Sequence, residues 1–312
     1  MRSLLFSVLL LAGCGGNWSN SDLTFANALP RRDDLRSKLP AASTSQPLEG
    51  VATRRDGLVV GDPSNAYAAT RKAATDYNSL LDLILGVVDQ VRLSPPTTRS
   101  SDSRTWGPFS DSNNPGREVQ AVITRVVTDA ATFEWHIQSR PNNGEFIEIL
   151  TGNFLATDTA RRGQGTFVVH VKDFRDVLKV DDTLKQLDQI DVGYVTDSFP
   201  QRVEMLFTVK PGSTLGISSL GYTARRQQDG SGAMRFLYAL TGNADVSEVE
   251  FNSAWKATGE GKATGVVTKG NYATYNVTEC WGQSFKVVHY AESWPTGVSS
   301  GPAADCPVID GF

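Results

Sequence analysis

The feature that most restricts the fold is an alternation of apolar and polar residues with a period of two, which runs over residues 118–290. It is clear where Phe133, Trp135 and Ile137 alternate with polar neighbours. Most of these short runs are separated by turns rich in glycine and asparagine, with no helical period between them. Repeated strands without intervening helices predict a mainly β fold of the α+β class, built on an antiparallel meander.

Two segments depart from this alternation. In residues 174–191 the apolar residues recur at spacings of three and four, which predicts a short helix or turn over one end of the sheet. Residues 94–117 are expected to form a loop that contains Trp106-Gly107-Pro108-Phe109. Two aromatic residues around a Gly-Pro turn favour a loop pinned onto the core, and the alternative is the lip of a binding site.

One long amphipathic helix is predicted over residues 64–93, ahead of the strands. Asp62-Pro63-Ser64 has the residue types of a helix start, and Pro95-Pro96 prevents continuation. Its apolar residues form a single stripe: Tyr67, Ala73, Tyr77, Leu80, Leu81, Ile84, Leu85, Val88 and Val91. A membrane-surface helix would need an excess of basic residues on the polar face, which this helix lacks, so we expect the stripe to pack on the sheet.

The chain begins with Arg2 followed by an apolar run over residues 4–11. Such a run is too short to span a bilayer, which takes about 20 apolar residues, and it is typical of a secretory signal peptide. The ending Leu11-Ala12-Gly13-Cys14 resembles the lipobox of bacterial lipoproteins. The alternative is an ordinary signal peptide with an incidental cysteine.

The lipobox resemblance implies a covalent anchor and a location. Residues 1–13 would be removed, and Cys14 would become a diacylglyceryl cysteine carrying acyl chains such as palmitate, which hold the protein in the membrane. Gly15 follows the cysteine, and in Gram-negative lipoproteins an Asp at that position favours the inner membrane. We therefore expect a lipid-anchored envelope protein of the outer membrane, and a Gram-positive owner stays open.

Residues 14–62 are rich in Ser, Asn, Ala and Pro, and they carry mixed charges such as Arg31-Arg32-Asp33-Asp34. This composition predicts a flexible tether between the lipid and the folded body. The body is then a single domain over residues 63–312.

Two cysteines remain once Cys14 is assigned to the lipid. Cys280 and Cys306 form an even pair in an oxidising compartment, which predicts a disulfide that ties down the C-terminal segment. The alternative is that Cys280 acts as a nucleophile with His289, nine residues further on.

The sequence offers little catalytic chemistry. His136, His170 and His289 fall in predicted strands without a metal-ligand spacing, so we expect no metal, no cofactor and no catalytic residue. An acidic run between Asp173 and Asp191 does not match a calcium loop and predicts a solvated face. The net charge is −4, or −5 once Arg2 is removed with the signal peptide, which argues against binding nucleic acid.

The order of elements, one helix and then a series of antiparallel strands, is similar to the half-barrel fold of periplasmic lipoprotein carriers and mycobacterial lipid-binding lipoproteins. This resemblance implies a curved sheet with a cavity for a hydrophobic ligand between sheet and helix. Six residues are expected to line it: Leu81, Ile84, Val88, Phe133, Trp135 and Phe207.

Three functions follow in order of preference. The first is a non-enzymatic lipoprotein that binds a lipid or other hydrophobic ligand. The second is a structural or protein-interaction lipoprotein with a packed interior, whose partner the sequence does not identify. The third is a hydrolase-like enzyme.

Overall fold

A computed structural model of the chain describes residues 18–40, 58–111, 115–127, 132–159, 161–173, 184–214, 216–293 and 297–309. The labelled α-helices in these ranges are α1 (Asn20–Asn27), α2 (Arg32–Leu35) and α3 (Asn65–Leu93), and residues 171–173 after β6 are also helical. The strands before residue 200 are β1 (Thr98–Arg99), β2 (Ser103–Ser110), β3 (Arg117–Val127), β4 (Thr132–Pro141), β5 (Ile147–Thr159), β6 (Arg162–His170) and β7 (Leu187–Val195). The later strands are β8 (Gln201–Val209), β9 (Ile217–Arg226), β10 (Gly232–Leu240), β11 (Glu248–Trp255), β12 (Gly261–Lys269), β13 (Asn276–Trp281), β14 (Val287–Glu292) and β15 (Ser299–Ser300). Two 3₁₀ turns, η1 (Leu184–Gln186) and η2 (Ala303–Asp305), complete the described elements.

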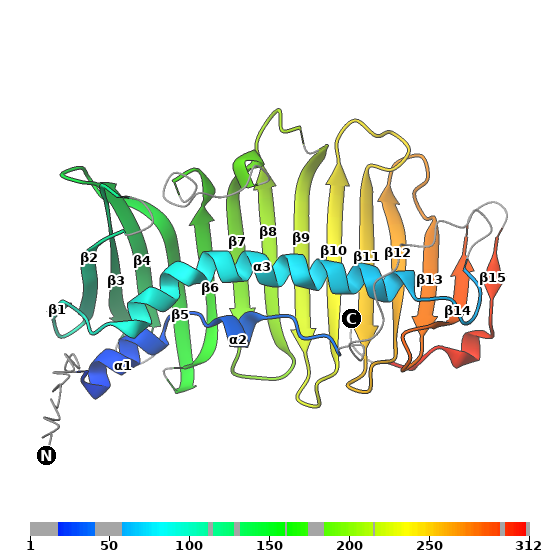
Figure 1. The fold of residues 1–312 in the computed structure, drawn as a ribbon, viewed down its shortest axis with the longest axis horizontal. Helices are drawn as coiled ribbons and strands as arrows, with labels where there is room; N and C mark the ends of the chain where they lie inside the picture. The colour runs from blue at the N-terminus through cyan, green and yellow to red at the C-terminus, as the bar shows by residue number, and fades with distance from the viewer. Residues whose placement is uncertain are drawn as a thin grey trace, which may run out of the picture.

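The strands form one open sheet of fifteen strands, whose spatial order is the order of the sequence (Figure 1). Each strand pairs antiparallel with its neighbours in the chain, as between β3 and β4 or β10 and β11. The prediction of a mainly β chain built on an antiparallel meander is confirmed. Both edge strands, β1 and β15, are only two residues long, which leaves little unpaired backbone along the edges.

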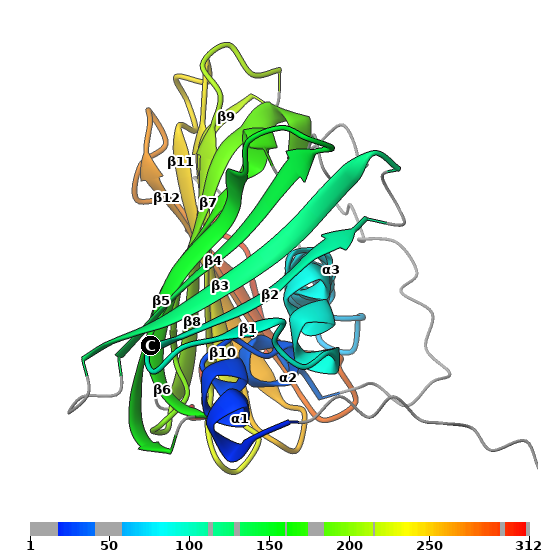
Figure 2. The same ribbon diagram turned by 90° about the vertical axis from the view of Figure 1, so that its left-hand side faces the viewer.

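The period of two separates the two faces of the sheet. In β8, Val203, Met205, Phe207 and Val209 are buried, while the residues between them are exposed. The buried face is the one that carries the helices, and Figure 2 shows the sheet curving around them. The core is therefore a single layer between the concave face of the sheet and the helices.

Helix α3 lies across this concave face, roughly perpendicular to the strands (Figure 1). Ser64 caps it, since its Oγ accepts a hydrogen bond of 3.0 Å from the Tyr67 backbone nitrogen. Its bounds, Asn65–Leu93, match the predicted helix over residues 64–93. Its buried residues include Tyr77, Leu81, Ile84, Leu85, Val88 and Val91, which lie on the predicted apolar stripe.

The prediction of a loop over residues 94–117 is wrong, because this segment contains β1 and β2. Trp106 is fully buried on the helix-facing side of β2. The pairing of β2 with β3 shifts register between Trp106 and Phe109, where Gly107 has a positive φ of 92°. A Gly-Pro pair is typical of a turn, but here it forms a bulge and the strand continues beyond it.

The predicted short helix or turn over residues 174–191 is also partly wrong. Residues 174–183 lie outside the described residues. Leu184–Gln186 forms the 3₁₀ turn η1, but β7 begins at Leu187 and pairs with both β6 and β8. Sheet pairing on both sides overrides the helical spacing of the local sequence.

Residues 18–40 are not part of a flexible tether, which corrects the prediction for residues 14–62. Phe25 and Leu35 are buried at 0% and 1% exposure. Asp22 of α1 is fully buried and pairs with Arg104 of β2 at 2.7 Å. Residues 14–17 and 41–57 lie outside the described residues.

Helix α2, which lies in the segment predicted to be a tether, is held to α3 by ion pairs. Arg36 pairs with Asp82 at 2.6 Å, and Arg32 pairs with Asp89 at 2.7 Å. The prediction failed here because a mixed-charge segment has the composition of a solvated linker, while its partners are tens of residues away on α3.

Candidate ligand groove

A groove lies between the second half of α3 and strands β2 and β3, at the end of the sheet where the strands begin. Its volume is about 490 Å³. It is lined by Leu83, Gly86, Val87, Gln90, Val91 and Ser94 on the helix side, and by Trp106, Phe109, Ser110, Asp111, Val119, Gln120 and Ala121 on the sheet side. We call this cavity the ligand groove.

The helix wall of the ligand groove is a second stripe on α3. Residues 83, 86, 87, 90 and 91 recur at helical spacing, so they share one face of the helix, and Ser94 follows as its C-cap. Gly86 sits within this stripe, and a Cβ added there would meet only an Arg32 nitrogen at 3.9 Å. Gly86 thus has room for a methyl group at its place on the helix wall.

The sheet wall is shaped by the bulge in β2. A Cβ at Gly107 would lie 2.6 Å from the Val119 carbonyl oxygen, so only glycine allows this close approach of β2 and β3. Trp106 is held from the helix side, since its Nε1 donates a hydrogen bond of 2.8 Å to the Ser94 carbonyl oxygen. Phe109, three residues on, remains 41% exposed. Of the predicted aromatic pair, one ring is thus fixed in the core and the other stays accessible to solvent.

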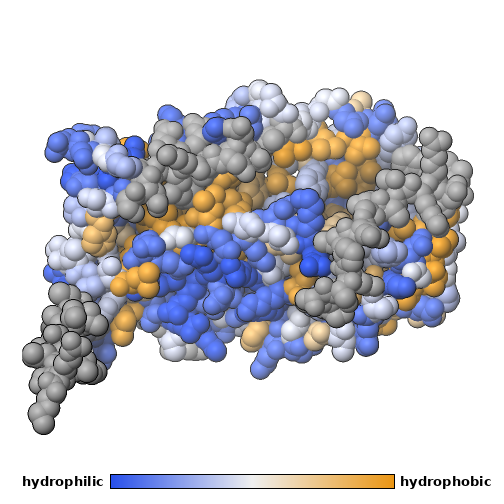
Figure 3. Space-filling view, viewed as in Figure 1, coloured by the Kyte–Doolittle hydropathy of each residue, from blue (hydrophilic) through white to orange (hydrophobic). Residues whose placement is uncertain are grey.

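The chemistry of the lining is mostly apolar with a few polar groups. Leu83, Val87 and Phe109 contribute apolar side chains, and Gln120 donates a hydrogen bond to the Gln138 Oε1 at 2.7 Å. Figure 3 shows hydrophobic surface in separate patches along this face, above a hydrophilic band. An apolar cavity with a few convergent polar groups is typical of small-molecule sites.

The six residues predicted to line a cavity lie elsewhere, and that assignment is wrong for the ligand groove. Leu81, Ile84, Val88, Phe133 and Trp135 are completely buried, and the sixth, Phe207, is 4% exposed. All six belong to one continuous packed core. The reason is geometric, because the residues at the centre of an apolar stripe pack directly on the sheet, whereas a void forms at its border.

Sequence reasoning therefore missed the residues that surround the groove. A signal existed in Gly86, a glycine inside a helix whose replacement by Ala would favour the helix. The two aromatic residues at positions 106 and 109 had been singled out, with a binding lip as the alternative to a pinned loop. Both line the groove.

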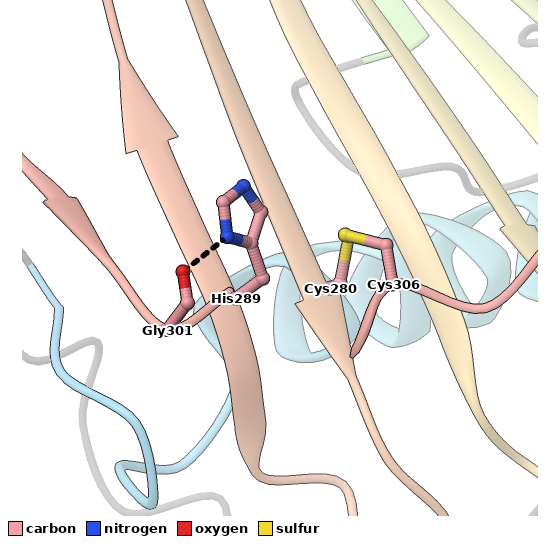
Figure 4. The surroundings of a disulfide bond; sticks show 4 residues. All are labelled: Cys280, His289, Gly301 and Cys306. Atoms are coloured by element: carbon pink, nitrogen blue, oxygen red, sulfur yellow. Dashed lines mark hydrogen bonds between the residues drawn. A yellow bond between two sulfur atoms is a disulfide. The ribbon is translucent and has the colours of Figure 1, made fainter. Parts of the chain in front are cut away.

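The predicted disulfide is present between Cys280 and Cys306 (Figure 4). Cys280 is fully buried in β13, and Cys306 follows η2, so the bond ties the C-terminal segment to the sheet. The His289 Nδ1 lies 2.9 Å from the Gly301 carbonyl oxygen. Because Cys280 is consumed in the disulfide, the alternative of a Cys280 nucleophile is excluded.

The other two histidines also have local partners. The His136 Nδ1 lies 3.3 Å from the Glu148 carboxylate, and the His170 Nε2 lies 3.1 Å from the Thr151 hydroxyl. Among the residues that the structure describes, no cluster of three or more His, Cys, Asp or Glu side chains could hold a metal ion. Much of the acidic run between Asp173 and Asp191 lies outside these residues.

The predicted signal peptide over residues 1–13 and the lipidation site at Cys14 lie outside the described residues. No helix in the described ranges is long and apolar enough to cross a membrane.

No protein-family model, no curated protein and no solved structure matches this chain.

Proposed function

We propose that this chain is a non-enzymatic envelope lipoprotein, acylated at Cys14, that binds a lipid acyl chain or another hydrophobic ligand in the ligand groove. The observation that carries the proposal is the groove itself. Its volume of about 490 Å³ falls within the range of small-molecule sites, roughly 300–1,000 Å³. In this proposal the sheet serves as the half-barrel of the family resemblance, and the ligand lies at one end of its concave face.

The lining supports an apolar ligand of this kind. Each methylene group that moves from water into such a groove contributes about 0.8 kcal/mol. Gln90 offers an amide group near the apolar surface of Leu83 and Val87, which suits a ligand with a polar head and an apolar body.

The test uses native mass spectrometry of a soluble form, secreted with a cleavable signal peptide that lacks the lipobox and followed by residues 15–312. We expect a co-purified mass in the range of an acyl lipid. Leu83→Glu places a carboxylate in the groove and should remove that mass. Leu206→Glu is the matched control, because Leu206 is 49% exposed on the opposite face of the sheet.

A protein that is recovered bare, and that takes up no fatty acid or phospholipid when these are added, would contradict ligand binding. It would leave the alternative of a structural or protein-interaction lipoprotein. Equal lipid content in the Leu83→Glu and Leu206→Glu variants would place the ligand outside this groove.

The anchor is tested separately on the full chain. Cys14→Ser, or treatment with globomycin, should block lipoprotein processing and release the protein from membranes. Acyl labelling that persists in the Cys14→Ser variant would refute the lipobox interpretation.

A further inference from the structure

The short segment between the proposed anchor and the first helix limits how the body can sit on a membrane. Cys14 precedes Ser19, the N-cap of α1, by five residues. A fully extended chain covers at most about 3.5 Å per residue, so this segment spans no more than about 18 Å. From Ser19 to residue 40 the chain belongs to the folded body.

Helix α1 is fixed firmly at one end of the sheet. The Asp22 carboxylate receives hydrogen bonds from the Arg104 Nε at 2.7 Å and from the Arg99 Nε at 3.1 Å. The guanidinium groups of Arg104 and Arg125 lie over the buried ring of Phe25, at 4.6 Å and 5.2 Å from its centroid. These contacts join α1 to β1, β2 and β3, so the short segment begins at this end.

The opposite end of the body is far from this point. Neighbouring strands lie about 4.8 Å apart, so fifteen strands extend the sheet by roughly 65 Å. Helix α3 alone, with 29 residues, is about 44 Å long. A segment of about 18 Å that starts at α1 keeps the β1–β3 end close to the bilayer, while β15 can lie well away from it.

We propose that the end of the body formed by α1, β1–β3 and the last turn of α3 docks on the surface of the lipid bilayer. This rests on the proposed acylation of Cys14. Leu23, Leu93 and Val126 are 46%, 75% and 50% exposed at this end and can enter the interface. The far end also exposes Val59, Val60 and Val308, so apolar exposure alone does not select an end. The short segment between Cys14 and Ser19 selects the end that carries α1.

This placement brings the ligand groove close to the bilayer, which is the source of a lipid ligand. The groove lies between β2, β3 and the second half of α3, at the end that faces the bilayer (Figure 1). A lipid could then pass between the membrane and the groove along a short path, without full exposure of its acyl chain to water.

The experiment uses the full acylated chain in vesicles of phosphatidylethanolamine and phosphatidylglycerol that carry a spin-labelled lipid. Two variants, Leu93→Cys and Val308→Cys, each receive one environment-sensitive fluorophore, since Cys14 is acylated and the other cysteines form the disulfide. We expect the fluorophore at position 93 to be quenched several-fold more than the one at position 308, with an emission shift to shorter wavelength.

Three outcomes are distinct. Strong quenching at 93 and weak quenching at 308 supports the docking. If the protein floats with the vesicles but 308 is quenched as much as 93, or neither is quenched, the docking is refuted. If intact mass shows no acyl groups and the protein does not float, the proposed lipid anchor itself is refuted, and the docking falls with it.

Discussion

The two ends of α3 are built in different ways. At the packed end, which we define as β13–β15 with the first turns of α3, the ring of Tyr67 lies 4.3 Å from that of Phe285 and 5.9 Å from that of Trp281. The indole nitrogen of Trp281 donates to the Gly259 carbonyl oxygen at 2.9 Å. At the groove end, which we define as β1–β3 with the second half of α3, a cavity of about 490 Å³ lies beside the bulge in β2.

The buried acidic groups of the two ends also differ. At the packed end the Glu279 carboxylate accepts hydrogen bonds from the Ser64 hydroxyl at 2.6 Å and from the Ala66 nitrogen at 3.1 Å, so it caps α3 without a cation. At the groove end Asp22 is neutralised by arginine side chains. Both halves of α3 are therefore held on the sheet, the first by packed rings and Glu279 and the second by its buried stripe and the ion pairs with α2, and the cavity lies at the border of that second half.

The largest expected effect is the difference in the free energy of unfolding when one large side chain is removed at each end. Trp281→Ala should lower the free energy of unfolding by about 4 kcal/mol, because it empties a fully buried site. Phe109→Ala should cost less than about 1 kcal/mol, because the ring is already partly in solvent. Guanidinium unfolding measures both, and equal losses would contradict the division into a packed and a hollow end.

The next effect concerns the disulfide at the packed end. Replacing both Cys280 and Cys306 with Ala opens a connection of 26 residues and should cost roughly 3 kcal/mol, mainly through the entropy of the unfolded chain. Lipid content of the groove should not change in this double variant, because the bond lies at the other end of the sheet. A loss of bound lipid at a temperature where the variant is folded would show that the two ends are coupled.

A third prediction uses pH to distinguish the ends. Burial would raise the pKa of Asp22, but hydrogen bonds from Ser19, Arg104 and Arg99 hold it at about 2. Because this value is below the ordinary 3.8, the group stabilises the fold above pH 3.8, and that contribution, about 2 kcal/mol, is lost as the pH falls towards 2. Asp22→Asn should remove this part of the acid sensitivity in unfolding curves measured from pH 6 to pH 2.

The contribution of Glu279 to stability should change with pH in the opposite direction to that of Asp22. Burial raises its pKa, against the hydrogen bonds from Ser64, Ala66 and Asn65, so the folded state favours the protonated form. Its contribution to stability is therefore greatest below the ordinary pKa of 4.5 and declines as the pH rises through the raised value. Glu279→Gln should flatten that decline, and a steeper decline in the variant would contradict this assignment.

The smallest effect tests the open helix wall. Gly86→Ala should raise the free energy of unfolding by up to about 1 kcal/mol, since Ala favours the helix and the added Cβ meets only one atom, at 3.9 Å. Gly193→Ala is a control, because its Cβ also meets open space but lies in a strand. Thermal unfolding of both variants measures the difference, and a destabilised Gly86→Ala would mean that the groove wall is more crowded than described.

Much of the fold could be predicted from the sequence, and the failures have specific causes. The period of two around Phe133 predicted strands, and the apolar stripe through Ile84 predicted the position of α3, because each pattern is local to its element. The pairing of Cys280 with Cys306 followed from the cysteine count. The strand β2 was missed because Gly107-Pro108 has the composition of a turn, while its pairing with β3 depends on residues eight or more positions away.

The sequence by itself determined the type of most long elements, such as α3 and β4, and the face that these bury, whereas β2 and the start of β7 were exceptions. Only the tertiary structure decided that Arg36 pairs with Asp82, and that residues 18–40 belong to the body, because charge pairs between distant segments leave no local pattern. The tertiary structure also decided where the groove lies. A cavity forms where side chains from α3 and two strands fail to fill the space between them, and that mismatch belongs to the assembled surfaces rather than to any one segment.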